Sequence, residues 1–210
     1  MKLEVYNKQG QATGRQVELP DHIFGIEPNE HVIYLAVKQY LANRRSGTHK
    51  TLEKSELSGS TRKLHKQKGT GGSRKGSIKN PLFKGGARIF GPRPRSYSFK
   101  LNKKVKELAK ISALSAKIAS NAIKVVEDFS LETPRTKEYV NFLKDFGLEN
   151  KKSLFILPEI NDNIYLSSRN IQGAGLAEVS NLNTYEIMNN SMILLSEKSI
   201  EALSNQLVNN

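Results

Sequence analysis

The sequence predicts an α/β fold, in which a mainly parallel sheet is flanked by helices and a long basic extended loop is inserted between two helices. Through residues 103–210, short apolar stretches typical of strands alternate with amphipathic helical patterns, an order that favours a parallel sheet. Residues 44–106 instead hold 19 of the 33 Lys and Arg residues and two of the 20 Asp and Glu residues, a net charge of +17. The other 147 residues sum to −4, so the whole positive excess of the chain lies in one segment.

The first predicted elements are a strand at residues 3–6 and an amphipathic helix at residues 30–42. Four side chains of this helix recur at helical spacing: Ile33, Val37, Tyr40 and Leu41. A second helix begins near Lys103, after the basic segment. Its apolar residues fall within an arc of roughly 120° on a helical wheel: Leu108, Ile111, Leu114 and Ile118.

Strands and helices continue to alternate beyond this helix. Strands are predicted at residues 123–127, 153–157, 177–179 and 192–195. Between the first two, Thr133 is the expected N-cap of a helix with Pro134 at its first position, and Gly147 is the expected stop. One face of that helix holds Tyr139, Phe142, Leu143 and Phe146.

The carboxyl-terminal part completes the pattern. A helix is predicted at residues 161–170, a turn-rich segment at residues 180–184, and a last helix that begins after Ser196, its expected cap. Three apolar residues share a face of the last helix: Ile200, Leu203 and Leu207. We therefore expect residues 1–43 and 104–210 to form one globular α/β domain, large enough for an ordinary core.

Residues 44–103 are expected to form an extended loop that binds a polyanion. The segment at 44–106 holds nine of the fifteen glycines and has no apolar periodicity before its end, so it cannot build a core. A long segment of this kind is usually functional, or ordered by a partner. Cations spread along an extended backbone contact many phosphates, which favours RNA. We predict RNA contacts at Lys50, Arg62, Lys63, Lys66, Lys68, Arg74, Lys75, Lys79, Lys84, Arg88, Arg93, Arg95, Lys100, Lys103 and Lys104.

The sequence gives little support for nucleotide binding, metal binding or catalysis. The glycines of the sequence GGSRKGS at residues 71–77 lack a preceding apolar strand and a lysine after the last glycine, so no nucleotide-binding loop and no cofactor are expected. Cysteine is absent, and the histidines show no ligand spacing, so we predict neither a metal site nor an enzyme. Glu53 and Glu56 are expected to pair with neighbouring cations.

No membrane association is expected either. No apolar run approaches the roughly 18 residues that cross a bilayer, and the chain begins without the apolar block of a signal peptide. The basic segment also lacks the bulky apolar face of a membrane-binding helix. We expect a soluble protein that is not a homo-oligomer.

Several motifs of the basic segment match a known family. They are Arg44-Arg45-Ser46-Gly47-Thr48-His49-Lys50, Ser58-Gly59-Ser60, Lys66-Gln67-Lys68-Gly69-Thr70-Gly71, Gly76-Ser77-Ile78, Gly85-Gly86, the run from Phe90-Gly91-Pro92-Arg93-Pro94-Arg95 to Leu101, and Asn102-Lys103-Lys104-Val105. With these motifs the chain resembles the family of bacterial large ribosomal subunit protein four, the L-four family. The resemblance extends to Leu19-Pro20 and Ile23-Phe24-Gly25-Ile26 before the loop and to Ala113-Leu114-Ser115 after it, and it covers essentially the whole chain.

The resemblance implies a structural protein of the large ribosomal subunit, in the cytoplasm, that binds large-subunit ribosomal RNA and supports assembly. It implies a loop that penetrates the RNA and a tip that lines the nascent-peptide exit tunnel, beside the neighbouring tunnel protein twenty-two and the nascent peptide. By motif position, the tunnel-lining residues would be Gln67, Lys68, Gly69, Thr70, Gly71, Gly72, Ser73 and Arg74. Some members of the family also control translation of their own operon.

This chain departs from the family pattern at the tip. Leu64-His65 stands where the family commonly has Pro-Trp, and Gly72-Ser73-Arg74 stands where it has Arg-Ala-Arg. The first change removes a large stacking surface and the second removes an arginine. Residues 52–54 replace a more basic stretch of the family, so we do not expect them to contact RNA.

Two alternatives stay open from the residues alone. One is a free-standing regulatory protein whose loop folds on messenger RNA. The other is an α/β enzyme with a cationic lid over a polyanionic substrate, which would need a carboxylate, thiol or metal cluster at the strand ends.

Overall fold

The computed structural model describes residues 1–208 and divides the chain into two compact units. The first contains Met1–Leu41 together with the chain from Lys100 onward, and the second contains Ala42–Phe99. We call the first the sheet unit and the second the loop unit. Each has its own architecture, and they are described separately.

The sheet unit is built on a six-stranded sheet with the order β2-β1-β3-β6-β4-β5. Its strands are β1 (Lys2–Tyr6), β2 (Ala12–Glu18), β3 (Ile123–Val126), β4 (Ser153–Leu157), β5 (Ala174–Glu178) and β6 (Met192–Ser196). All neighbouring pairs are parallel except β1 and β2, which are antiparallel. The predicted fold class, a mainly parallel sheet flanked by helices, is therefore confirmed.

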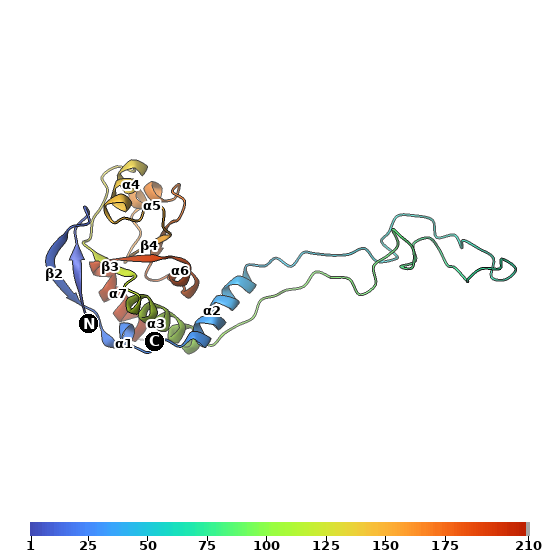
Figure 1. Cartoon of the computed structure of the whole chain (residues 1–210), viewed down its shortest axis with the longest axis horizontal. Coiled ribbons are helices and arrows are strands. Elements are labelled where there is room, and N and C mark those ends of the chain that lie inside the picture. Colours follow the sequence, from blue (N-terminus) through green and yellow to red (C-terminus); the bar gives the residue numbers. More distant parts are fainter. Residues whose placement is uncertain (209–210) are drawn as a thin grey trace. The chain divides into compact units, whose positions relative to one another are not determined.

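Helices cover both faces of this sheet, with α4 and α5 on one side and α1, α3 and α7 on the other (Figure 1). The helices of the chain are α1 (Asp21–Phe24), α2 (Glu30–Asn43), α3 (Lys103–Ala119), α4 (Thr136–Asp145), α5 (Asp162–Ser168), α6 (Thr184–Asn189) and α7 (Glu197–Val208). Buried parallel strands need this arrangement because successive side chains point to opposite faces, and both faces must be covered.

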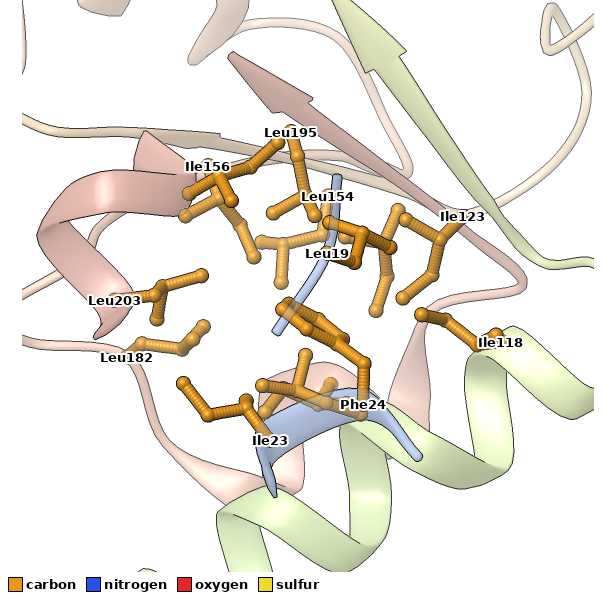
Figure 2. Close-up of a cluster of buried hydrophobic side chains, with 14 of the residues drawn as sticks. Leu19, Ile23, Phe24, Ile118, Ile123, Leu154, Ile156, Leu182, Leu195 and Leu203 are labelled. Atoms are coloured by element: carbon orange, nitrogen blue, oxygen red, sulfur yellow. The ribbon is translucent and has the colours of Figure 1, made fainter. Parts of the chain in front are cut away.

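The alternation of side chains along β4 and β6 divides the core into two clusters. Leu154 and Ile156 of β4 join Ile193 of β6 in a cluster with α1, α3 and α7, which Figure 2 shows around Phe24. Phe155 of β4 instead packs with aromatic and aliphatic residues of α4. Its ring lies 5.8 Å from that of Phe142, measured between centroids. The two clusters fix the strand register, because a shift by one residue would exchange the faces.

Several predicted boundaries are wrong, and others are confirmed. Helix α4 begins at Thr136 with Arg135 as its N-cap, so Thr133 and Pro134 precede it. Its end agrees with the prediction: Gly147 has a positive φ of 68°, and its N–H donates to the Lys144 carbonyl at 2.8 Å. The next N–H, of Leu148, donates to the Leu143 carbonyl at 2.8 Å, which completes a Schellman motif.

The cap of α7 also differs from the prediction. The Ser196 hydroxyl is buried without a hydrogen-bond partner in the described part of the chain, so it does not cap the helix. Asp128, which follows β3, supplies the cap instead, because its carboxylate accepts a hydrogen bond of 3.4 Å from the Lys198 N–H. A residue 70 positions away in sequence therefore closes this helix end.

Two apolar side chains predicted to face the core are exposed, namely Leu41 of α2 and Leu108 of α3. In both helices small or polar residues are buried in their place. Ala36 and Gln39 are buried in α2, and Ala109 is buried in α3. The buried stripe of each helix is therefore rotated relative to the apolar pattern.

Three elements were not predicted from the sequence, namely β2, α1 and α6. Strand β2 carries one half-buried apolar residue, Val17, because it lies at the edge of the sheet. Helices α1 and α6 span four and six residues, too short for a helical period to appear. Strand β5 begins three residues earlier than predicted, at Ala174, and α5 has Asn161 as its N-cap.

Candidate nucleic-acid interface

The loop unit consists of two chain segments that run antiparallel to one another, an outgoing arm and a returning arm (Figure 1). Isolated backbone hydrogen bonds join them. The Arg95 N–H donates to the Gly47 carbonyl at 3.1 Å, the Thr51 N–H to the Pro92 carbonyl at 3.1 Å, and the Arg88 N–H to the Leu52 carbonyl at 3.2 Å. No helix or strand of three or more residues lies between positions 44 and 99.

Glycine is required where the arms approach most closely. Gly47 has a φ of 63°, and a Cβ atom there would lie 2.0 Å from the carbonyl oxygen of Arg95. At Gly91 a Cβ atom would lie 2.0 Å from the hydroxyl oxygen of Thr51. Real Cβ atoms essentially never approach this closely, so Gly47 excludes every residue with a Cβ atom unless the arms move apart, whereas a Cβ atom at Gly91 would require the Thr51 side chain to move.

An aromatic cluster lies near the base of the two arms. Two guanidinium groups lie over the ring of Tyr97, that of Arg45 with its Cζ atom 4.0 Å from the ring centroid and that of Arg95 at 4.7 Å. The Tyr97 hydroxyl and the Nε2 atom of His49 are 3.1 Å apart and share a hydrogen bond. Cation–π contacts therefore hold two like charges together, and no described carboxylate forms an ion pair with either guanidinium group.

The two carboxylates of the loop unit each pair with a predicted RNA-binding cation. Lys50 contacts Glu56, and Arg93 contacts Glu53, so the prediction that both acids have local partners is confirmed. The hydrogen bond from Lys50 lowers the pKa of the Glu56 carboxyl below its ordinary value of 4.5, and a backbone hydrogen bond from Glu53 adds to the effect. Lys50 and Arg93 are thus partly neutralised, unlike the cations nearer the tip.

The tip, residues 61–74, is exposed throughout. One backbone hydrogen bond closes it, from the Leu64 N–H to the Gly76 carbonyl at 3.1 Å, and Lys63 donates to the side-chain oxygen of Gln67. Gly69 and Gly71 have φ values of 85° and 64°, with open space where a Cβ would lie. These glycines turn the backbone rather than admit a neighbouring segment.

The predicted RNA-binding residues are distributed over both units. Lys75 and Lys79 are half-buried, and the other cations of the set are exposed. Lys100, Lys103 and Lys104 belong to the sheet unit, the last two in the first turn of α3, where Lys103 lies 4.0 Å from Glu107. The set omitted Arg45 and Tyr97. The antiparallel pairing of the arms brings these two residues together, but the register of that pairing cannot be read from the sequence.

Other kinds of site find no support in the structure. Among the described residues no group of three or more histidine and acidic side chains could hold a metal ion. No helix within residues 1–208 is long and apolar enough to span a membrane.

Comparison with known proteins identifies the family. The Ribosomal protein L4/L1 family matches residues 17–206. The chain belongs to this family. It is 56% identical over 208 residues to large ribosomal subunit protein uL4 of Bacteroides thetaiotaomicron, covering 99% of this chain and 100% of that one. It is 57% identical over 207 residues to uL4 of Flavobacterium psychrophilum and 54% identical over 207 residues to that of Porphyromonas gingivalis, each covering 99% of both chains.

Membership of the L4/L1 family confirms the resemblance that the motifs of the basic segment predict. It also excludes one of the two open alternatives, the enzyme. Proteins of this family are structural and not enzymes, so the cationic segment is not the lid of an active site.

Proposed function

We propose that this protein is a structural component of the large ribosomal subunit, that its loop unit binds large-subunit ribosomal RNA, and that this binding supports assembly of the particle. The relatives carry the name of a large-subunit protein, and in bacteria that subunit is cytoplasmic. The observation that carries the proposal is the combination of exposed cations with an almost complete lack of burial. In residues 42–99 only Ser77 and Ala87 are buried.

The charge of the loop unit explains why it needs a polyanion. Its two carboxylates are already paired with Lys50 and Arg93, and the tip itself, residues 61–74, contains no acid. Cations held side by side repel one another, and binding to phosphates replaces that repulsion with attraction and releases condensed counterions. The cationic residues predicted from the sequence are the proposed contacts.

We further propose that the tip lines the nascent-peptide exit tunnel. Residues 67–74, Gln67 to Arg74, are exposed, and glycine occupies three of these eight positions, where it adds no side-chain bulk. The partners at this site would be tunnel protein twenty-two and the nascent peptide. Leu64-His65 and Gly72-Ser73 offer less stacking surface and less charge than the Pro-Trp and Arg-Ala of the family pattern.

A loop-deleted variant tests the RNA-binding proposal. The Asn43 side-chain oxygen accepts a hydrogen bond of 3.3 Å from the Phe99 N–H, so a short Gly-Ser linker can replace residues 44–98 without separating the chain ends. We expect the variant to retain the circular dichroism of the sheet unit but to lose tight binding to transcribed large-subunit ribosomal RNA and incorporation into the particle. Incorporation at the level of the full chain would refute the proposal.

The same cations would also contact a structured messenger RNA, which supports a secondary role in translational autoregulation. Adding the protein to a cell-free translation of its own messenger tests this role. Repression by the full chain, and no repression by the loop-deleted variant, is the expected result.

A further inference from the structure

Phe90 is the most unusual apolar residue of the loop unit. Its side chain is fully exposed, and its backbone φ of 53° lies in the left-handed region. Within residues 1–208, Asn121 is the other residue besides glycine with a positive φ, and asparagine tolerates this region far better than a bulky aromatic. A strained backbone that holds an aromatic ring in solvent is a reason to look for a ligand beside it.

Phe90 borders a hollow of about 770 Å³, within the range of roughly 300–1,000 Å³ typical of small-molecule sites. The hollow lies entirely in the loop unit. Its lining residues come from the outgoing arm, from the turn near position 80 and from the returning arm: Thr51, Glu53, Lys54, Asn80, Pro81, Ala87, Arg88, Ile89, Phe90, Gly91 and Arg93.

Close backbone contacts build the walls of this hollow. The hydrogen bonds from Arg88 to Leu52 and from Thr51 to Pro92 join the two arms at its sides. The Ala87 N–H donates to the Lys79 carbonyl at 3.0 Å, which closes the turn. A Cβ atom at Gly86 would lie 2.0 Å from the Asn80 carbonyl oxygen, so this turn also requires glycine. The hollow is thus a feature of the backbone, not of side-chain placement alone.

The chemistry of the lining matches a nucleotide. Phe90, Ile89 and Pro81 offer apolar surface, and the flat Phe90 ring can stack on a base. Lys54 and Arg88 supply positive charge and have no ion pair with the described residues, whereas Arg93 contacts Glu53. A nucleotide combines a flat base with a phosphate and so uses both properties of the site.

We propose that this hollow receives a single unpaired nucleotide of the large-subunit RNA, with its base stacked on Phe90 and its phosphate near Arg88 and Lys54. This inference rests on the proposed function. It also assigns a contact to Lys54, although residues 52–54 are not predicted from the sequence to contact RNA. The net charge of +17 in residues 44–106 favours a polyanion over an apolar protein segment as the occupant.

Three substitutions of Phe90 test the stacking. Binding to transcribed large-subunit ribosomal RNA is measured at fixed salt concentration. Stacking of a base on an aromatic side chain corresponds to roughly a 5- to 150-fold change in affinity, so we expect Phe90→Ala to weaken binding within that range. Phe90→Trp should retain the affinity, whereas Phe90→Leu, apolar but not flat, should lose most of it. Leu82→Ala is the matched control, because Leu82 is 86% exposed in the same unit but does not line the hollow.

Ultraviolet crosslinking of the wild-type complex identifies the occupant. Mass spectrometry should find a nucleotide attached to Phe90 or to a neighbour that lines the hollow. If the wild type binds the RNA and Phe90→Ala binds equally well, the inference is wrong while the proposed function stands. If the wild type does not bind the RNA, both fail. If Phe90→Ala binds free RNA normally but no longer enters the particle, the occupant is a protein, which also overturns the inference.

Discussion

The sheet unit and the loop unit differ in how their backbone groups form hydrogen bonds and in how far their side chains are buried. In the sheet unit, parallel strands pair their peptide groups and bury apolar side chains on both faces, so the fold is stabilised from within. In the loop unit, isolated hydrogen bonds and glycine contacts join two arms whose side chains face solvent. The difference indicates that the sheet unit carries most of the stability of the protein, and we propose that the loop unit carries its RNA binding.

The largest expected effect concerns the core. Phe155 is buried at the centre of the cluster beneath α4, where its ring stacks 5.6 Å from that of Phe129. Phe155→Ala should lower the free energy of unfolding by about 3–5 kcal/mol, measured by urea denaturation. Leu82→Ala in the loop unit is the control and should change it by less than about 0.5 kcal/mol. Equal destabilisation by both variants would contradict the division of roles.

A smaller effect is expected where the arms meet. Gly47→Ala places a methyl group against the Arg95 carbonyl and puts alanine in the left-handed region, a strain of roughly 1–3 kcal/mol. Affinity for large-subunit ribosomal RNA should therefore fall by about 5- to 150-fold, while the urea midpoint of the sheet unit stays unchanged. Gly76→Ala is the matched control, since a Cβ atom there meets open space at negative φ. A parallel loss of affinity in the control would count against the geometric argument.

Single charges should have smaller effects still. Lys66→Gln at the tip removes at most one phosphate contact, so the slope of log affinity against log salt should become shallower by up to roughly 0.7–0.9. Lys137→Gln, which removes an exposed cation from α4, serves as the control and should leave the slope unchanged. If both substitutions change the slope alike, the claim that the loop unit, and not the sheet unit, binds the RNA is contradicted.

The smallest effect concerns the pair of Lys50 and Glu56. Because the pKa of Glu56 is lowered, the pair stabilises the local turn above pH 4.5 and is lost as the pH falls through the lowered pKa. A carbon-detected NMR titration of the Glu56 carboxyl should give a midpoint below 4.5. In Lys50→Ala the midpoint should move up toward 4.5, because the largest cause of the shift is gone. An identical midpoint in the two proteins would exclude the hydrogen bond as the cause.

The fold was predictable because the sequences of the core strands have a clear apolar pattern. β4 and β6 are apolar runs bounded by polar residues, and their order with the intervening helices implies a parallel sheet. Strand β2 was not predictable, since an edge strand needs little apolar surface. Nor was the cap of α7, because the choice of Asp128 over Ser196 depends on how β3 and β6 lie beside each other in the folded sheet.

Some features of the candidate nucleic-acid interface were predictable from the sequence, and others were not. Its charge, its glycines and its lack of a core are properties of a contiguous segment, and the sequence alone displays them. The cluster of Arg45, Arg95 and Tyr97, and the hollow beside Phe90, depend on which residues the two arms bring opposite one another. That register is set by a few backbone hydrogen bonds without a repeating pattern, so no periodicity in the sequence reports it.

The central claim is that the loop unit is embedded in ribosomal RNA and not bound at its surface. Sedimentation of cell lysate through a high-salt cushion, with the protein tracked by immunoblot, tests this most directly, because salt removes peripheral electrostatic binders but not threaded ones. We predict that the protein stays with the large subunit in equal stoichiometry. Release to the top fractions would contradict the claim and favour a peripheral or regulatory RNA-binding protein.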